Sequence, residues 1–428
     1  MEVIVGRCCG LDVHQATIVA CALVEVEGRR PRKEVRTFRA MHSELEALRG
    51  WLLSQQITHV TMEGTGVYWI PVYTVLEGHV DLTVVNARHV KKVPGRKTDV
   101  SDAEWLASLL RHGLLRKSFV PAKEIRVIRD VCRYRRMLVQ SETTEKNRII
   151  KLLETTGIKL ASVATDVFGK SGMAMVRAIA DGNVSVETMV QFAKSHLRRK
   201  LPDLRLALDV LVADHHRIML RDQLARLDRT SEEIARYDAR LDELVKPYAA
   251  SMELLRTIPG MQRIAAIEVF AEVGPDLASF PDAAHFASWA GTCPGSNESA
   301  GKRGSTRRRR GNPYLQSILV EAALAATRKK DSFFKDKYHR LKARRGAMRA
   351  IFAIANKLAG AVYRALAQGQ IFRDLGASFL DGRDVTKTAT KLIERLRNLP
   401  IDPRELSALL SQTLASSTPA PSAAISAT

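Results

Sequence analysis

The sequence predicts an α/β domain built on a mixed sheet, followed by mostly α-helical regions. Two observations support this prediction. Over roughly the first 120 residues, strand-like and helix-like segments follow the order β-β-β-α-β-α-β-α, which is typical of a sheet covered by helices. Beyond Val120, apolar residues recur mainly at helical spacing.

Each element of the α/β part has its own signal. Residues 7–26 are rich in Val, Ile, Cys, Ala and Thr, and residues 36–39 resume this pattern after a Gly-Arg-Arg-Pro turn, so three antiparallel strands are expected. A helix should begin at Ser43, because Ser43 and Glu46 form a capping box ahead of apolar residues at three- and four-residue spacing. The elements that follow are a strand at 57–63, a helix from about 67, a strand at 80–86 and a helix from about 101.

Four regions are expected along the chain. They are an α/β domain at 1–155, a helical and coiled-coil region at 156–250, a helical domain at 251–370, and an extension at 371–428. The extension ends in a Ser-, Ala- and Pro-containing tail, predicted to be disordered from about residue 411. Between 213 and 245 an interrupted three- and four-residue apolar spacing predicts an imperfect coiled coil. Self-association and packing within the chain are both open interpretations.

The composition limits the class of protein. With 428 residues, 46% hydrophobic and 26% charged, the chain is typical of a globular protein with more than one domain. It contains no unbroken apolar run of the length that spans a membrane and no signal-peptide pattern at its start, so we expect a cytoplasmic protein without membrane contact. Its five cysteines form no C-x-x-C pair, which argues against a zinc knuckle or a disulfide framework.

Positive charge is the strongest compositional signal. The net charge is +21, and 16 Lys and Arg against three acidic residues place +13 of it between Gly301 and Ala350. Such an excess predicts a nucleic-acid partner, with a solvated basic face as the alternative. The candidate phosphate contacts are Lys97, Lys302, Arg303, Arg307, Arg308, Arg309 and Arg310.

Four acidic residues are candidate metal ligands. Asp12 interrupts an apolar strand, Glu63 ends another beside glycines, and Asp99 and Asp102 lie three residues apart at a helix start. Oxygen ligands suit Mg²⁺ or Mn²⁺, and paired ions stabilise the attacking and leaving oxygens in phosphodiester cleavage. Each acid alone is also explained as a cap or an ion-pair partner. Together they predict nuclease-like chemistry.

Several motifs resemble a known family. The segments Gly10-Leu-Asp-Val-His14, Met62-Glu-Gly-Thr-Gly-Val-Tyr-Trp69 and Lys97-Thr-Asp-Val-Ser-Asp-Ala103 resemble the insertion-sequence transposases of the Asp-Glu-Asp-Asp type. Segments at 255–260, 286–295, 299–302 and 311–312 resemble the C-terminal domain of that family. The resemblance implies a Holliday-junction-resolvase-like N-terminal domain of the ribonuclease-H-like fold. It also implies transposase activity guided by a structured noncoding RNA that the element encodes.

Ser299 is the candidate nucleophile. It lies in a small-residue loop ahead of an arginine run, where a hydroxyl can approach a phosphate that arginine neutralises. On the residues alone, a phosphate contact or a turn is the commoner role for such a serine. The resemblance implies that a serine in this loop cuts and exchanges DNA strands together with the acidic domain. Ser299 matches that position, and Ser296 is its rival.

Three functions are therefore compared. The first is a transposase or site-specific recombinase that uses Mg²⁺ (or Mn²⁺) held by the four acids and the hydroxyl of Ser299, and assembles as a homo-oligomer through the coiled coil. The second is a metal-dependent junction-resolving nuclease in which Ser299→Ala retains cleavage. The third is a non-catalytic DNA-binding protein that shows no Mg²⁺-dependent cutting.

Overall fold

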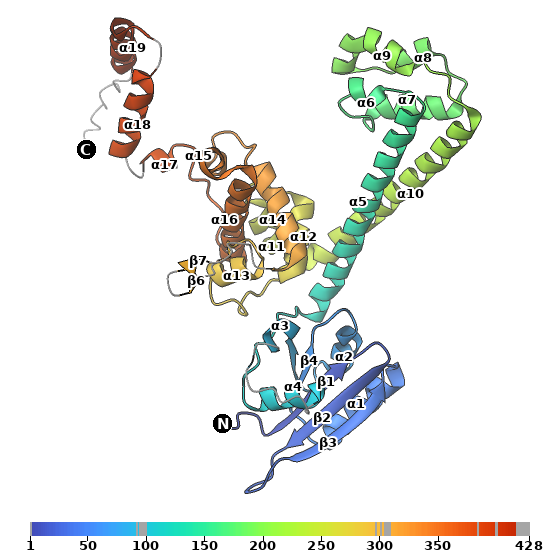
Figure 1. Cartoon of the computed structure of the whole chain (residues 1–428), viewed down its shortest axis with the longest axis vertical. Coiled ribbons are helices and arrows are strands. Elements are labelled where there is room, and N and C mark those ends of the chain that lie inside the picture. The colour runs from blue at the N-terminus through green and yellow to red at the C-terminus, as the bar shows by residue number, and fades with distance from the viewer. Residues whose placement is uncertain are drawn as a thin grey trace, which may run out of the picture. The chain divides into compact units, whose positions relative to one another are not determined.

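The computed structural model describes residues 2–90, 93, 101–295, 298–299, 302–303, 310–382, 385–398 and 401–416. The chain divides into two compact units, Met1–Ala122 and Lys123–Thr428 (Figure 1). The predicted mixed sheet lies in the first unit, and the second is mostly helical, which confirms the predicted fold class. The four-region division stays a prediction.

The first unit is built on one five-stranded sheet with the order β3-β2-β1-β4-β5. Its strands are β1 (Arg7–Val13), β2 (Thr17–Val24), β3 (Arg32–Arg39), β4 (His59–Glu63) and β5 (Asp81–Val85). The first three are antiparallel neighbours, whereas β4 runs parallel to both β1 and β5. The C-terminal ends of β1, β4 and β5 therefore meet at one edge of the sheet.

Helices cover both faces of this sheet (Figure 1). On one face, α1 (His42–Ser54) and α2 (Trp69–Leu76) share a core with alternate residues of β1 and β4, namely Cys9, Leu11, Val60 and Met62. On the other face, Cys8 of β1 packs against Ala103 and Ala107 of α4 (Asp102–Arg111). A short helix, α3 (Ala87–Val90), follows β5.

The prediction that Ser43 caps α1 is wrong. The helix begins one residue earlier, at His42, and its N-cap residue Met41 makes no side-chain hydrogen bond. The backbone N–H groups of Glu44 and Leu45 instead donate to the carbonyl oxygen of Met41. Because the chain turns helical before Ser43, that side chain lies inside the first turn rather than ahead of it.

A long pair of helices begins the second unit. α5 (Lys123–Thr155) and α10 (Asp214–Val245) pack antiparallel, since Arg135 of α5 contacts Asp238 near the end of α10 while Glu145 contacts Arg226 earlier in it. The buried apolar residues of α10 are Leu220, Leu224, Leu227, Leu241 and Val245. These residues pack within the chain, as one of the two interpretations of the coiled coil expects; self-association stays a prediction.

A helical head covers the far end of this pair (Figure 1). It consists of α6 (Leu160–Val163), α7 (Lys170–Asp181), α8 (Val186–Gln191), the 3₁₀ helix η1 (Ser195–Lys200) and α9 (Leu201–Leu208). Its core includes Ile149 of α5 and Leu224 of α10, so the paired helices and the head form one hydrophobic cluster.

At the other end of α5 and α10 lies a C-terminal helical lobe. After the 3₁₀ turn η2 (Lys246–Tyr248), its helices are α11 (Ala249–Arg256), α12 (Arg263–Val273), α13 (Ala283–Trp289), α14 (Pro313–Ala326), α15 (Phe333–Arg345) and α16 (Ala347–Gln368). Three more helices follow: α17 (Phe379–Gly382), α18 (Val385–Arg397) and α19 (Pro403–Ser416). α19 thus covers the first residues of the predicted disordered tail, and the residues after Ser416 lie outside the described part.

Helix α16 is the centre of this lobe. It packs against α11, α13, α14 and α15, and residues such as Ile354, Leu358 and Val362 are fully buried. Among the described residues, it is also the one helix long and apolar enough to cross a membrane, with half of that stretch buried inside the protein. A core helix of a folded lobe passes the same test of length and composition, and the packing assigns α16 to that role. The predicted cytoplasmic location stays a prediction.

Candidate active site

Asp12 and Glu63 lie at the ends of two neighbouring parallel strands. The register pairs Leu11 with Met62, so Asp12 and Glu63 each follow a paired position. Leu11 and Met62 face the core formed with α1 and α2. Because side chains alternate along a strand, Asp12 and Glu63 are directed to the opposite face, which α4 covers. The side chain of Asp12 is 28% exposed, and its Oδ2 lies 3.1 Å from Nε2 of His14.

Helix α4 brings Asp102 toward the same end of the sheet. The helix runs opposite to β1: the carbonyl of Arg111 accepts the N–H groups of Ile4 and Val5, and farther along β1 the helix lies on Gly10. A Cβ at Gly10 would overlap the backbone of Ala103, so glycine permits this close packing. The N-terminus of α4, which begins at Asp102, is therefore directed toward the Asp12 end of the strand.

The start of α4 matches the predicted helix start. Ser101 is its N-cap, and the Ser101 side chain accepts the backbone N–H of Glu104 at 3.3 Å. Asp102 is exposed in the first helical turn, where the helix dipole stabilises negative charge. The predicted ligand Asp99 and the predicted phosphate contact Lys97 lie outside the described residues.

The donors at this edge suit a hard cation. Asp12, Glu63 and Asp102 offer only carboxylate oxygens, the ligands that Mg²⁺ and Mn²⁺ prefer. In the described ranges, no group of three or more His, Cys, Asp or Glu side chains is arranged to hold a metal ion. The fold thus directs three of the four predicted acids to one edge without gathering their side chains into a ligand group, and their joint role as metal ligands stays a prediction.

The serine loop lies between α13 and α14 of the second unit. Within it, β6 (Glu298–Ser299) pairs antiparallel with β7 (Lys302–Arg303), which places Ser299 opposite Lys302 in the backbone register. The side chains of these residues are not described. Arg310 is exposed. The predicted residues Ser296, Arg307, Arg308 and Arg309 lie outside the described residues.

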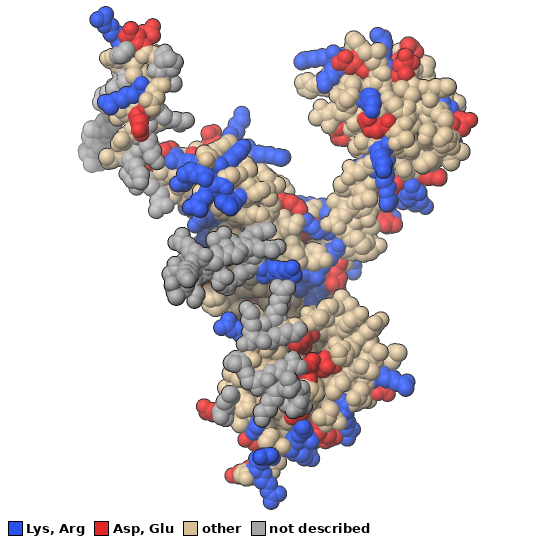
Figure 2. Space-filling view, viewed as in Figure 1, with Lys and Arg blue, Asp and Glu red and all other residues tan. Residues whose placement is uncertain are grey.

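A basic surface follows the loop in sequence. Its exposed members lie just after α14, in α15 and near the start of α16; they are Arg328, Lys329, Lys330, Lys342, Arg344, Arg345 and Arg349. Figure 2 shows Lys and Arg side chains gathered over this part of the second unit. The local positive field of such a cluster attracts a polyanion and falls with added salt.

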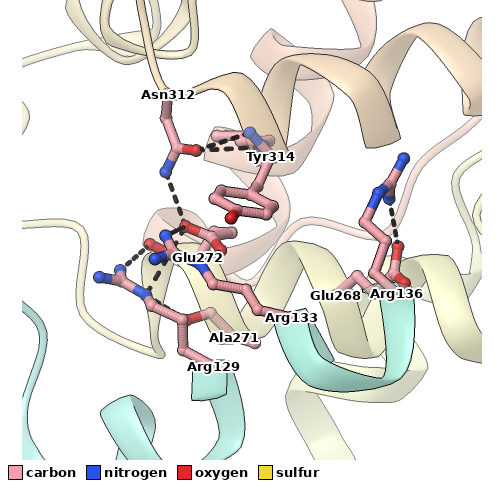
Figure 3. A network of polar contacts seen from close by, with 9 residues as sticks. Arg129, Arg133, Arg136, Glu268, Ala271, Glu272, Asn312 and Tyr314 are labelled. Atoms are coloured by element: carbon pink, nitrogen blue, oxygen red, sulfur yellow. Dashed lines mark hydrogen bonds and ion pairs between the residues drawn. The ribbon is translucent and has the colours of Figure 1, made fainter. Parts of the chain in front are cut away.

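A buried polar network joins α5 to the lobe that carries the loop (Figure 3). The Arg133 guanidinium donates from Nε and Nη2 to the two carboxylate oxygens of Glu272, both at 2.9 Å, and stacks 4.1 Å from the ring centre of Tyr314. Arg129 donates to the backbone carbonyls of Ala271 and Glu272. Burial lowers the pKa of Arg129 to about 10, although Glu272 acts to raise it.

A second buried acid lies one turn earlier on α12. Glu268 is 7% exposed and accepts from Nη1 of Arg136 at 3.0 Å. Burial raises the pKa of Glu268, while Arg136 and Arg135 act to lower it. Neither Glu268 nor Glu272 is among the residues predicted from the sequence. Their signal is two acids four residues apart in the otherwise apolar segment Ile264-Ala-Ala-Ile-Glu-Val-Phe-Ala-Glu-Val273.

The ribonuclease-H-like sheet, the acids at its strand ends and the basic helical lobe define a class of protein that performs phosphoryl transfer on nucleic acid. Comparison with known proteins narrows this class. Residues 9–158 match the DEDD transposase domain of the IS110 family, and residues 252–339 match the Transposase IS116/IS110/IS902 family. The transposase for insertion sequence element IS1111A from Coxiella burnetii is 25% identical over 299 residues, which cover 68% of this chain and 72% of that protein.

The chain belongs to the IS110 family of transposases, which confirms the resemblance found in the sequence. It is accordingly an enzyme of DNA phosphoryl transfer that binds DNA and serves the mobility of an insertion sequence. The non-catalytic alternative is thereby set aside.

Proposed function

We propose that this transposase cuts and exchanges DNA strands with the acids of its N-terminal unit and the hydroxyl of Ser299. The main support is the placement of Asp12 and Glu63 on neighbouring parallel strands, on the face where α4 directs Asp102 toward the same edge. Asp99 completes the set by its position in the sequence, three residues before Asp102.

The four acids hold Mg²⁺ or Mn²⁺. When bound, the ions neutralise charge on the phosphate and stabilise the attacking and leaving oxygens. Asp12 and Glu63 are fixed by their strands, whereas Asp102 is fixed by a capped helix. Strands and capped helices are rigid, so they hold these three carboxylates in a constant geometry, as a metal site requires.

Ser299 acts as the nucleophile. Its Oγ forms a bond to the phosphorus of one DNA phosphodiester, and the bond from that phosphorus to a deoxyribose oxygen breaks. The proton of the hydroxyl ends on the departing deoxyribose oxygen, directly or through solvent. The resulting phosphoserine link conserves the phosphodiester energy, so a second DNA hydroxyl can reverse the step and complete strand exchange.

The positive charges serve the nucleic acids. Lys97, Lys302, Arg303, Arg307, Arg308, Arg309 and Arg310 contact phosphates of the DNA near the cleavage site, and these contacts position the strand without reading its sequence. A noncoding RNA encoded by the element supplies the sequence information. RNA that copurifies with the protein and matches the flanks of its gene supports this part of the proposal, and a fully active RNA-free protein contradicts it.

The working form is a homo-oligomer through the coiled-coil region. The chain's own α5 covers the buried apolar residues of α10, so a second copy would contact the remaining faces of this helix pair. The mass of the full chain in solution, measured by light scattering, tests this point. A monomer that is active in strand exchange would contradict it.

Covalent trapping tests the serine step. Purified protein is incubated with Mg²⁺ and a suicide DNA substrate whose cleaved end diffuses away, and the adduct is mapped by mass spectrometry. We expect a DNA-linked peptide that carries phosphoserine at Ser299, no adduct from Ser299→Ala, and a normal adduct from Ser296→Ala. A Ser299→Ala protein that still cleaves the DNA favours the junction-resolving nuclease instead, while an adduct at Ser296 assigns the nucleophile to that residue.

A further inference from the structure

The serine loop is closed at its base by two glycines that touch. A Cβ at Gly311 would overlap the backbone of Gly291 and the carbonyl oxygen of Trp289. Next to this contact, the N–H of Asn312 donates to the carbonyl oxygen of Trp289 at 3.0 Å, and the side chain of Gln316 donates to the carbonyl oxygen of Gly291. The chain therefore leaves α13 and returns to α14 through one narrow passage, called here the neck, which Gly291 and Gly311 form.

Asn312 is the residue at which this neck joins α14. Its Oδ1 accepts the N–H groups of Tyr314 and Leu315 at 3.0 and 3.2 Å, so it caps the helix. Its Nδ2 donates to Oε2 of Glu272 at 2.7 Å. One side chain thus ties the returning end of the loop both to α14 and to α12, and both ends of its amide are used.

Glu272 is itself held rigidly. It is 2% exposed, and Arg133 of α5 donates hydrogen bonds to both of its carboxylate oxygens. The same guanidinium stacks on Tyr314, in the first turn of α14 (Figure 3). A bidentate arginine and a buried carboxylate allow little rotation, because each alternative leaves a buried charge without a partner. Helix α5 therefore fixes the neck through Glu272.

We propose that Glu272 is a positioning residue for strand cleavage: through Asn312 and the Gly291–Gly311 neck, it sets the position of the loop that carries Ser299. This inference rests on the proposed role of Ser299. Displacement of a reacting group by about 1 Å costs roughly 100-fold in rate when the chemistry depends on alignment. Loss of the Glu272 anchor therefore slows the formation of the phosphoserine link and leaves the affinity for DNA unchanged.

The chain offers a matched control on the same helix. Glu268 is also buried on α12 and is also held by arginines of α5. Its partner Arg136, however, contacts Ser317 and Glu321 rather than the residues of the neck. Glu268→Gln and Glu272→Gln remove the same charge from similar surroundings. A purely structural role predicts that both variants lose activity in proportion to their loss of thermal stability.

The measurement is the rate of Ser299 adduct formation on suicide DNA at saturating DNA, together with DNA affinity and the thermal midpoint. We expect Glu272→Gln to slow the adduct about tenfold or more. Asn312→Asp should do the same, because it keeps the helix cap but loses the donor to Glu272. Glu268→Gln should stay within about twofold of the wild-type rate once it is normalised to folded protein, because it leaves the aligned neck intact.

The double variant Glu272→Gln/Asn312→Asp supplies a rescue. It exchanges the amide and the carboxylate, so the hydrogen bond re-forms with its direction reversed and the total charge is kept. We expect it to be faster than either single variant. The inference is overturned if Glu272→Gln and Asn312→Asp form the Ser299 adduct at the wild-type rate, or if Glu268→Gln slows as much as they do. A wild-type protein that forms no adduct at Ser299 instead overturns the proposed function.

Discussion

Carboxylates occupy two contrasting surroundings in this protein. The side chain of Glu272 is 3% exposed, and fixed guanidinium and amide donors occupy both of its oxygens. The side chain of Asp12 is 28% exposed at the end of a strand, where it contacts a ring nitrogen of the exposed His14. A carboxylate saturated by fixed donors stabilises the fold, whereas one at an open strand end is available to a cation. Burial and partners, rather than residue type, separate the two roles.

The sharpest test of this contrast replaces an acid at the sheet edge. Asp12→Asn should reduce Mg²⁺-dependent cleavage of element-end DNA at least about 100-fold, because loss of a metal ligand removes several kcal/mol of transition-state stabilisation. Cleavage of labelled DNA by purified protein measures this. Asp81→Asn is the control, since Asp81 is an exposed acid at the start of β5, at the opposite edge, and pairs with Lys117. Equal cleavage by both variants would show that Asp12 is not part of the active site.

The opposite pattern is expected for the buried acid. Glu272→Ala should lower the free energy of unfolding by about 3–5 kcal/mol, because it leaves buried guanidinium and amide donors without a partner. Asp12→Asn should change it by less than about 1 kcal/mol, since the site is partly exposed. Urea denaturation followed by circular dichroism measures both. If the two variants lose a similar free energy of unfolding, burial does not explain the difference between Glu272 and Asp12.

The same comparison of surroundings applies to positively charged side chains, which are exposed on the basic surface. Arg344→Ala combined with Arg345→Ala should weaken DNA binding similarly for all sequences, and the slope of log affinity against log salt should fall by about 0.9 for each phosphate that the protein no longer neutralises. Binding is measured by fluorescence anisotropy over a salt series. Arg236→Ala, at an exposed arginine on α10, is the control and should leave the slope unchanged. An unchanged slope in the double variant would place the phosphate-binding residues elsewhere.

The smallest expected effect concerns Asp282, the N-cap of α13. The backbone N–H of His285, the His285 ring and the N–H of Ala284 hold the pKa of this carboxyl below its usual 3.8. A lowered pKa in the folded state means that this stabilisation is present above pH 3.8 and is lost as the pH falls through the lowered value. Thermal midpoints of wild type and Asp282→Ala should therefore differ at neutral pH and converge in strong acid. A constant difference across this range would show that the cap acts without its charge.

Local patterns predicted the sheet and its acids. Segments rich in apolar and strand-forming residues marked β1, β2 and β4, and an acid that ends or interrupts such a segment, as Asp12 and Glu63 do, identified candidate ligands. The start of α4 was predicted near residue 101, and the structure shows Ser101 as its N-cap. These features depend on residues that are close in the sequence.

The arginine network depends on contacts between distant segments. Arg133 lies 139 positions from Glu272, and Asn312 lies 40 positions from it. The arginines of α5 have the spacing of an ordinary solvated charged face, and nothing in the apolar segment around Glu272 names its partner. Only the packing of α5 against α12 and α14 reveals which of these side chains meet and that they are buried. The same limit applies to α10, where an identical apolar pattern serves self-association or packing within the chain.

The most direct measurement is strand exchange in vitro with purified protein, donor and target DNA, and the RNA transcribed from the element. We expect joined DNA products in Mg²⁺, none with a chelator, and none from Asp12→Asn or Ser299→Ala proteins that remain folded. Products formed in the presence of the chelator, or by the folded Asp12→Asn protein, would contradict the claim that carboxylates at the sheet edge carry the chemistry.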